Sequence, residues 1–434
     1  MKTKLFILLI FIFISSQVYS QDFQWRLLPN SPGTTGSGRY EDIFFINENT
    51  GWVISFGYST YKTTDGGNSW TRYANSEYYN RSIGFFDSLT GVIGRLSASG
   101  TMMRTTNGGI NYSIIGGLPS LAGICGISIV TDSLAYACGT YNAKANVVKT
   151  TDKGITWNSI FSDTSLAKTL VDCYFRTSDS GIAVGGYNNH GGYYNGNAVI
   201  IKTNDGGASW QRVHITNRTR EWCWKISFIS GNIGFVSIER ETGFAYILKT
   251  TNNGLNWTDI PFMEYDEEGI GFVNENTGWV GGWTGPTYQT TNGGANWQIA
   301  GWGTNVNRFR FFGDTLGYAV GDRVYKYSRG PVGIQSLSNN IPEKFSLSQN
   351  YPNPFNPTTK IKFDLPSIVN NILSIVSLKI FDVLGKEVAK LFNEKLSPGS
   401  YEVEFNGSNF SSGIYFYKLE TENFIQTKRM ILLK

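Results

Sequence analysis

A short polar phrase that could carry catalysis or metal binding occurs six times along the chain. It reads Thr, any residue, Asp or Asn, any residue, Gly, and its first copy holds Thr63, Asp65 and Gly67. A carboxylate at a fixed offset is a candidate general acid, general base or metal ligand. The later copies begin at Thr105, Thr150, Thr203, Thr250 and Thr290, so successive copies start 40 to 53 residues apart. One active site does not need six equivalent turns, and self-similarity at this period is typical of repeat architectures. We therefore interpret this phrase, called the box below, as a structural turn.

Each position of the box has a structural role in this interpretation. The Asp or Asn accepts hydrogen bonds from amides of the turn, and the Gly adopts a positive φ that a β-carbon would oppose. The aromatic residue that closes most copies can bury against the neighbouring repeat. These roles fall to Asp65, Gly67, Trp70, Asn107, Gly109, Asp152, Gly154, Trp157, Asp205, Gly207, Trp210, Asn252, Gly254, Trp257, Asn292, Gly294 and Trp297.

A second repeated pattern sets the number of units. An apolar run, a polar turn, Gly or Ala and another apolar run occur seven times, against six boxes. The seventh unit ends at Val324–Tyr327 without a box, whereas Phe23–Leu27 resembles the segment that closes the first box. We predict an all-β fold, a seven-bladed β-propeller whose last blade is completed by the N-terminal strand, with Trp25 as its closing aromatic residue. Rings of six or eight blades and a linear β-solenoid are the alternatives, and the displaced strand favours the closed ring of seven.

The ends of the chain differ from the repeats. Lys2 and Lys4 precede the apolar run Leu5–Ile14, which is too short to span a bilayer comfortably and predicts a cleavable secretory signal over residues 1–20. No later segment is long enough for a transmembrane helix. We predict the propeller over 22–327, a linker over 328–344 and a β-sandwich over 345–434, where short strand-like runs alternate with turns. The formal charge of +4 and the lack of a basic block argue against a nucleic-acid partner.

The chain has four cysteines, and export would permit disulfides. Cys125 and Cys138 flank one hairpin turn almost symmetrically, which favours them as a pair. Cys173 and Cys223 could pair or stay free, since four cysteines allow three connectivities. No Cys-x-x-Cys spacing occurs and only two histidines are present, so we expect no metal and no cofactor.

The C-terminal region carries a specific resemblance. The segments 348–359 (SQNYPNPFNPTT), Gly413–Tyr417 and Lys428–Lys434 resemble the type A C-terminal sorting domain of the type IX secretion system. That resemblance implies passage through the periplasm, a second export step across the outer membrane, and a product that is extracellular or attached to the cell surface. It also implies the type IX secretion machinery as a partner. An accessory Ig-like module is the alternative.

The repeats carry a second resemblance. The box resembles the Asp-box, or bacterial neuraminidase repeat, and its pairing with a Gly-Trp-Val hairpin resembles the photosystem II assembly-factor propellers and their bacterial relatives. This resemblance covers about residues 22–327 and implies a non-enzymatic propeller that binds another protein. The alternative is an Asp-box glycoside hydrolase, sialidase-like or endoglucanase-like, acting on extracellular glycans. Arg26 and Arg39 do not fit the phrase that holds the first arginine of a sialidase triad. A pair of carboxylates on facing loops would serve other glycosidases, with Glu221, Glu264, Asp266, Glu267 and Glu268 available.

Ligand binding is expected on the face opposite the box turns. The connections from each box to the next hairpin lie on that face, as does an insertion in the fourth unit. Aromatic and Arg side chains on such loops are typical anchors for a protein or glycan ligand. The candidates are Arg81, His190, Tyr193, Tyr194, Arg220, Trp222, Trp224, Trp302 and Arg308. Burial of Trp222 and Trp224 between blades is the alternative for these two. We expect a monomer.

Overall fold

The computed structural model describes residues 23–434 except 29, 33–37, 56–58, 75–78, 98–100, 120, 140–142, 188–195, 242, 263–266, 330–334, 339–341, 367–373, 397 and 409. The regular secondary structure of the described residues consists of β-strands. The chain divides into two compact units, one of which spans Trp25–Ser328 and the other of which contains Arg329–Lys434. The predicted signal segment, residues 1–20, lies outside the described residues.

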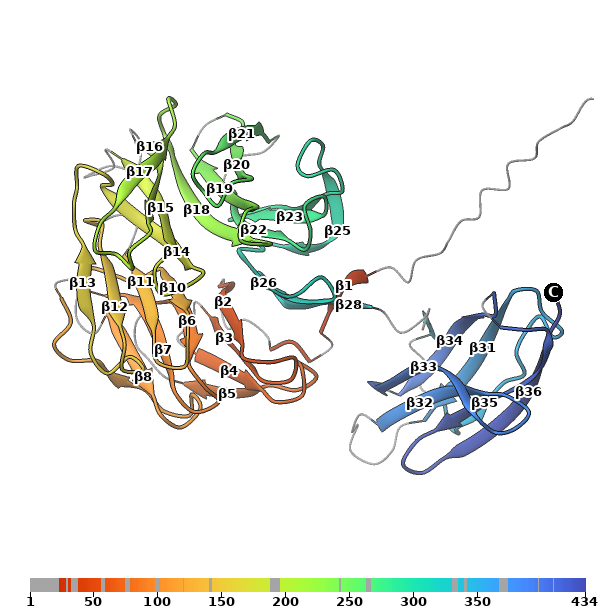
Figure 1. Cartoon of the computed structure of the whole chain (residues 1–434). Helices are drawn as coiled ribbons and strands as arrows, with labels where there is room; N and C mark the ends of the chain where they lie inside the picture. Colours follow the sequence, from red (N-terminus) through yellow and green to blue (C-terminus); the bar gives the residue numbers. More distant parts are fainter. Residues whose placement is uncertain are drawn as a thin grey trace, which may run out of the picture. The chain divides into compact units, whose positions relative to one another are not determined.

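The larger unit is a ring of seven antiparallel sheets, each of four strands (Figure 1). Within the first six sheets the strands follow chain order from the centre of the ring outward. Blades one to three are β2 (Tyr40–Phe45), β3 (Gly51–Ser55), β4 (Ser59–Thr63) and β5 (Thr71–Ala74); β6 (Tyr79–Phe85), β7 (Gly91–Leu96), β8 (Met102–Thr105) and β9 (Ser113–Ile114); and β10 (Gly126–Ile129), β11 (Ala135–Cys138), β12 (Val147–Thr150) and β13 (Asn158–Phe161). Blades four to six are β14 (Thr169–Phe175), β15 (Gly181–Tyr187), β16 (Asn197–Thr203) and β17 (Gln211–Ile215); β18 (Glu221–Phe228), β19 (Gly234–Arg240), β20 (Tyr246–Thr250) and β21 (Thr258–Pro261); and β22 (Glu267–Phe272), β23 (Gly278–Gly282), β24 (Pro286–Thr290) and β25 (Gln298–Thr304).

The seventh blade combines the two ends of the propeller sequence. Its strands are β26 (Arg308–Phe312), β27 (Leu316–Val320) and β28 (Val324–Arg329), and β1 (Phe23–Leu27) pairs with β28 as the outermost strand. Trp25 stacks on Trp302 of the sixth blade with ring centroids 4.7 Å apart and meets Trp279 edge-on at 5.5 Å. The predicted seven-bladed ring, closed by the N-terminal strand, is confirmed.

An aromatic ladder joins neighbouring blades. In four blades, the aromatic residue after the Gly or Ala that opens the second strand stacks on the last aromatic residue of the next blade's innermost strand. Trp52 stacks on Phe85, Tyr136 on Phe175 and Phe235 on Phe272, each with centroids 3.5 Å apart. Across the closure, Tyr318 stacks on Phe45 at 3.7 Å. The repeated apolar pattern therefore describes contacts between blades as much as contacts within them.

The box turns form one face of the ring, which we call the box face. In the fourth blade's turn, the Thr203 hydroxyl accepts a hydrogen bond from the Gly207 amide at 2.9 Å and donates one to Asp205 at 2.8 Å. The Asp205 carboxylate in turn accepts bonds from the amide and hydroxyl of Ser209, at 2.8 and 2.5 Å. Gly207 has φ of 94°. Each box also bonds to the tip of its own blade's first hairpin, as Gly206 does to Asp179 at 2.9 Å. The connections between blades start from the opposite ends of these strands and form the loop face.

The smaller unit is a β-sandwich. One sheet has the order β29 (Gln335–Ser338), β34 (Gly399–Asn406), β31 (Thr358–Leu365) and β30 (Ser346–Leu347), and the other has β33 (Glu387–Leu396), β32 (Ser374–Phe381), β35 (Gly413–Glu420) and β36 (Ile425–Leu432). Side chains of both sheets form one core, with Phe363 and Val403 from the first sheet and Leu378 and Tyr417 from the second. The Tyr417 hydroxyl accepts a bond from the Asn350 amide and donates one to the Ser348 carbonyl, both at 2.8 Å. The Asn-Pro-rich segment is thus held against the sandwich, and the predicted second all-β domain is confirmed.

Candidate functional site

The innermost strands share an irregularity that shapes the centre of the ring. In four of them the pairing with the next strand skips one residue, and in β18 it skips two. Such β-bulges turn a side chain out of the regular alternation. The equivalent position in every blade lies ten residues before the Gly or Ala that opens the second strand. Its occupants are Glu41, Arg81, Cys125, Val171, Trp224, Glu268 and Asn307. One side of this ring of residues is polar and the other side is apolar, where Cys125, Val171 and Trp224 pack together with Trp222.

The polar side is a connected group of buried charges, which we call the mouth cluster: Arg39, Glu41, Tyr79, Arg81, Glu268 and Asn307. Glu41 lies 3.2 Å from Nε of Arg39 and 2.7 Å from Nη1 of Arg81. Arg39 also pairs with Glu268 at 2.5 Å, and Tyr79 donates a hydrogen bond to Glu41 at 2.9 Å. These residues come from blades one, two, six and seven, at the ends of the innermost strands that belong to the loop face.

The two carboxylates of the mouth cluster differ electrostatically. Burial would raise the pKa of Glu41, but the guanidinium groups of Arg39 and Arg81 outweigh it, so the pKa is lowered. Burial also raises the pKa of Glu268, and there the attraction of Arg39 does not offset it, so the pKa stays above its ordinary value. Glu41 is therefore held as a carboxylate, while Glu268 is more readily protonated.

Five buried polar atoms of the mouth cluster have no hydrogen-bond partner among the described residues. Two of them, Nη2 of Arg39 and Oε2 of Glu268, form the ion pair described above. The other three are Nη1 of Arg39, Nε of Arg81 and Oδ1 of Asn307. Buried polar atoms are nearly always satisfied by protein, water or ligand. Next to them, the Arg39 guanidinium lies 4.1 Å from the ring centroid of Trp283, whose side chain is 45% exposed. The cluster thus offers unsatisfied donors and an acceptor beside an exposed aromatic ring.

A second charged group, the plug, lies one residue further along the same strands. Arg308 of the seventh blade contacts Asp42 of the first at 3.0 Å and Asp172 of the fourth at 2.8 Å. Asp42 also accepts a bond from the Ile83 amide of the second blade, and Asp172 accepts one from the Ile226 amide of the fifth. The plug therefore ties five blades together across the centre of the ring.

Lys225 is a further charged residue of the plug. It is buried, and burial lowers the pKa of its ammonium group, with Arg308 lowering it further and Asp172 opposing. Asp172 shows the reverse balance, because Arg308 and Lys225 outweigh the effect of burial and lower the pKa of its carboxyl group. The charges of the plug are buried and paired with one another across blades, so we interpret the plug as a group that stabilises the ring.

The structure places the predicted binding residues in different settings. Arg81 joins the mouth cluster, and its guanidinium carbon lies 5.4 Å from the ring centroid of Trp224. Trp222 and Trp224 are buried, which is the alternative raised for them above. Arg308 lies in the plug instead of on an exposed loop, and Trp302 packs against Trp25. Arg220 is exposed, with φ of 65°. Three more candidates, His190, Tyr193 and Tyr194, lie outside the described residues.

The sequence predicts only part of the mouth cluster. Arg81 is among the predicted binding residues and Glu268 among the available carboxylates, whereas Glu41 and Asn307 are not singled out. Arg39 is weighed only as a sialidase arginine, whose phrase it does not fit. A signal exists in the sequence, because aligning the seven hairpins on the Gly or Ala that opens the second strand places Glu41, Arg81 and Glu268 at one position. A charged residue that recurs at this position in several hairpins therefore marks the mouth cluster.

The expected disulfide between Cys125 and Cys138 is not formed in this structure, in which all four cysteines are buried free thiols. Gly126, not Cys125, is the strand partner of Cys138, and neighbouring residues in a strand face opposite sides. Cys125 accordingly packs with Val171 and Trp224, whereas Cys138 packs with Cys173 in another cluster.

The described residues contain no group of three or more His, Cys, Asp or Glu side chains placed to hold a metal ion. Nor do they form a helix with the length and apolar character that a bilayer crossing requires.

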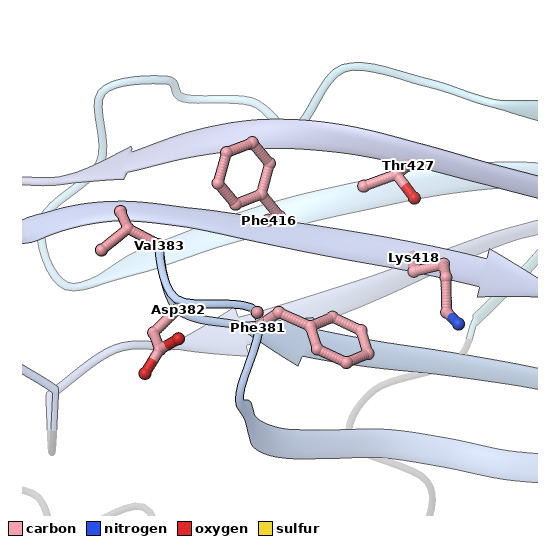
Figure 2. A pocket seen from close by; sticks show the side chains of 7 residues that line it. Phe381, Asp382, Val383, Phe416, Lys418 and Thr427 are labelled. Atoms are coloured by element: carbon pink, nitrogen blue, oxygen red, sulfur yellow. The ribbon is translucent and has the colours of Figure 1, made fainter.

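The C-terminal unit has a pocket of about 290 Å³ (Figure 2). Phe416 and Lys418 of β35 line it together with Phe381 at the end of β32 and Thr427 of β36. Phe416 and Lys418 alternate along β35 with the core residues Tyr415 and Tyr417, so the pocket lies on the sheet face away from the core. Lys418 also pairs with Glu420 at 3.1 Å.

Comparison with known proteins bears on each unit separately. Residues 349–433 match the family described as the secretion system C-terminal sorting domain. No curated protein sequence matches the chain significantly. Among solved structures, YCF48 from Cyanidioschyzon merolae aligns with a TM-score of 0.53 and 18% identity, over 70% of this chain and 98% of that one. A structure of YCF48 bound to D1 peptide gives 0.51 and 18%, over 70% and 96%. The GH74 xyloglucanase from Xanthomonas campestris gives 0.49 and 9%, over 94% and 68%.

These matches confirm the predicted sorting domain and the predicted similarity of the propeller to the photosystem II assembly factor. A C-terminal sorting domain of the type IX system directs its carrier out of the cell and implies an interaction with the secretion machinery. The chain is therefore an exported protein of the cell surface or extracellular space, in which a seven-bladed propeller with the fold of YCF48 precedes a secretion system C-terminal sorting domain.

Proposed function

We propose that the propeller is a non-enzymatic binding module, which holds a polypeptide partner over the mouth cluster on the loop face. The observation that carries this proposal is the set of unsatisfied polar atoms on Arg39, Arg81 and Asn307, grouped beside the exposed ring of Trp283. A peptide supplies carbonyl and carboxylate oxygens for the arginines, an amide for Asn307 and apolar side chains for the ring.

Two further points support a peptide ligand. The same fold holds a peptide in the structure of YCF48 with D1 peptide. Arginine and tryptophan are also the residues most enriched where truncation weakens protein–protein binding. Electrostatically, Glu41 and Glu268 preorganise Arg39, so that less side-chain freedom is lost on binding.

Glycoside hydrolysis is the second candidate, and one observation favours it. Glu41 and Glu268 share Arg39 as a neighbour, and their pKa values shift in opposite directions, as those of a base and an acid do. Both side chains are almost fully buried and engaged by arginine, however. A general acid or base must exchange a proton with its substrate, whereas Glu41 is paired with Arg39 and Arg81 and Glu268 is paired with Arg39. For this reason we favour binding.

The test uses the purified full-length chain on a peptide array and a glycan array in parallel. For peptides bound by the wild type, Trp283→Ala is expected to weaken binding roughly tenfold or more, as loss of an aromatic anchor does. Leu255→Ala is the matched control, because Leu255 is 49% exposed and lies in a box turn on the other face. It is expected to bind as the wild type does.

The proposed surface would be contradicted if both variants lost binding equally, or if both bound as the wild type does. Enzymatic activity is tested separately with xyloglucan, cello-oligosaccharides and sialosides. Turnover by the wild type that disappears in Glu268→Gln, while the variant keeps its thermal stability, would establish the glycosidase instead.

A further inference from the structure

Cys138 and Cys173 face each other across the boundary between the third and fourth blades. Cys138 ends β11, and Cys173 lies within β14, the innermost strand of the next blade. Both side chains are buried, and both belong to one apolar cluster that spans the two blades.

The aromatic ladder fixes how the two cysteines meet. Tyr136 and Cys138 alternate with Ala137 and therefore point from β11 toward the fourth blade, as Cys173 and Phe175 point from β14 toward the third. Tyr136 stacks on Phe175 with centroids 3.5 Å apart. Cys138 and Cys173 are each two residues further from this stack, so they form the next pair across the same boundary.

Two contacts show how close the strands come there. The sulfur of Cys173 lies 4.0 Å from the Tyr136 carbonyl oxygen. At Gly126, the strand partner of Cys138, an added Cβ would lie 2.8 Å from the Cα of Asp172 and 3.0 Å from the sulfur of Cys138. Because Gly126 has no side chain, the backbone of β14 and the Cys138 sulfur both approach this point.

The other two thiols are turned elsewhere. Cys125 packs toward the centre of the ring with Val171 and Trp224. Cys223 lies in the cluster between the fourth and fifth blades, with Ile182 and Val184, so the fourth blade separates it from Cys138.

We propose that Cys138 and Cys173 form a disulfide that joins the third and fourth blades when the exported chain folds in an oxidising compartment. The oxidant is a disulfide-bearing thiol oxidase or a small-molecule disulfide. One cysteine thiolate attacks that disulfide and releases a thiol, and the second cysteine then displaces the other thiol and closes the protein bond. Two protein thiols are oxidised, one external disulfide is reduced to two thiols, and two protons pass to those thiols.

The bond forms during folding, before the blade boundary closes. In the folded chain, burial raises the pKa of the Cys138 thiol, and the hydrogen bond with Cys173 adds to this effect. A buried thiol that stays protonated is inert toward an external oxidant. Oxidant present during refolding is therefore required, and oxidant added afterwards is expected to act slowly.

The test refolds the reduced full-length chain with oxidised and reduced glutathione and counts thiols in denaturant. We expect the count to fall from four to two, with a Cys138–Cys173 cross-linked peptide in the non-reduced digest. Cys173→Ala is expected to keep its three remaining thiols, whereas the Cys125→Ala, Cys223→Ala double variant still forms the bond. The oxidised wild type should melt roughly 5 °C or more above its reduced form.

Four free thiols after oxidative refolding, with a chain that folds normally, would overturn the proposal. A cross-link through Cys125 or Cys223 would do the same. If Cys173→Ala fails to fold, Cys173→Ser and the digest of the wild type still decide the connectivity.

Discussion

Arg308 and Asp172, which lie 136 positions apart in the sequence, form a two-pronged ion pair across the centre of the ring, with distances of 2.8 Å from Nη1 and 3.2 Å from Nη2. They belong to the seventh and fourth blades, which are not neighbours. Stability of a propeller otherwise comes from contacts between adjacent blades. This pair and its partner Asp42 instead couple distant blades directly.

Arg308→Met is expected to destabilise the propeller by about 3–5 kcal/mol, because it removes the guanidinium group that pairs with both buried carboxylates, Asp42 and Asp172. Urea unfolding followed by tryptophan fluorescence measures this change. Lys153→Met is the matched control, since Lys153 pairs with Asp87 at 3.2 Å but both side chains are 39% exposed. Its cost is expected to be about 1 kcal/mol or less. Similar costs in the two variants would mean that the plug contributes no more than a surface pair.

The number of blades follows from the sequence because it depends on local patterns that repeat. Turn residues such as Asp65 and Gly67 recur at one offset, and the missing box after Val324–Tyr327 points to the N-terminal strand. The mouth cluster depends on long-range geometry. Bulges at Glu41, Arg81 and Glu268 aim charges to the centre. The pattern within a single hairpin does not reveal a bulge, and only the comparison of several hairpins shows that the charges recur at one position.

The predicted cysteine pairing was also limited by geometry that the sequence does not show. Cys125 and Cys138 are close in sequence around one turn, and this closeness suggested a bond. Which face of the strand each side chain takes depends on the register Gly126 to Cys138, which a one-residue shift would reverse. Arg308 was similarly assigned to a loop surface, although the strand begins at that residue and turns it inward.

Substitution of Trp25, the closing aromatic residue, tests the closure of the ring by the N-terminal strand β1. Trp25→Ala is expected to cost about 3–5 kcal/mol, because Trp25 is buried against Trp302, Trp279 and Phe309. Hydrogen exchange should show the added opening concentrated in β1, β28 and the sixth blade. Exchange that rises evenly around the ring would contradict a local closure.

The hydrogen bonds of the box turns predict that the stability of the propeller falls at acid pH. Hydrogen bonds from the Ser209 hydroxyl, with those from its amide and from Thr203, lower the pKa of Asp205 to about 2. The folded pKa lies below the unfolded value, so this contribution is present above about pH 4 and is lost as the pH falls toward 2. The melting temperatures of the wild type and Asp205→Asn should therefore converge as the pH falls from 5 to about 2.

The converse substitution provides the control for the acid dependence. Asn252 occupies the same position in the fifth blade and accepts a bond from the Asn256 amide at 3.0 Å. Asn252→Asp is expected to add acid sensitivity over the same pH range. A constant difference between Asp205→Asn and the wild type at every pH would show that the carboxylate titrates normally.

Gly269 tests whether the mouth cluster depends on close approach of two blades. An added Cβ at Gly269 would lie 2.4 Å from the Val306 carbonyl oxygen and 2.8 Å from the Cα of Asn307. These are backbone atoms, so Gly269→Ala must push β22 and β26 apart. We expect a cost of about 3 kcal/mol, at the upper end for overpacked sites.

Gly313→Ala is the control for Gly269→Ala, because Gly313 has φ of 65° and open space around its added Cβ. It should cost about 1–2 kcal/mol, from backbone strain alone. Separation of the blades would also move Asn307 away from Glu41, to which its amide donates at 3.5 Å. Gly269→Ala should therefore weaken the peptide binding proposed for the mouth cluster, and Gly313→Ala should leave it unchanged. Binding that survives in Gly269→Ala at temperatures where the variant is folded would show that the ligand does not use Asn307.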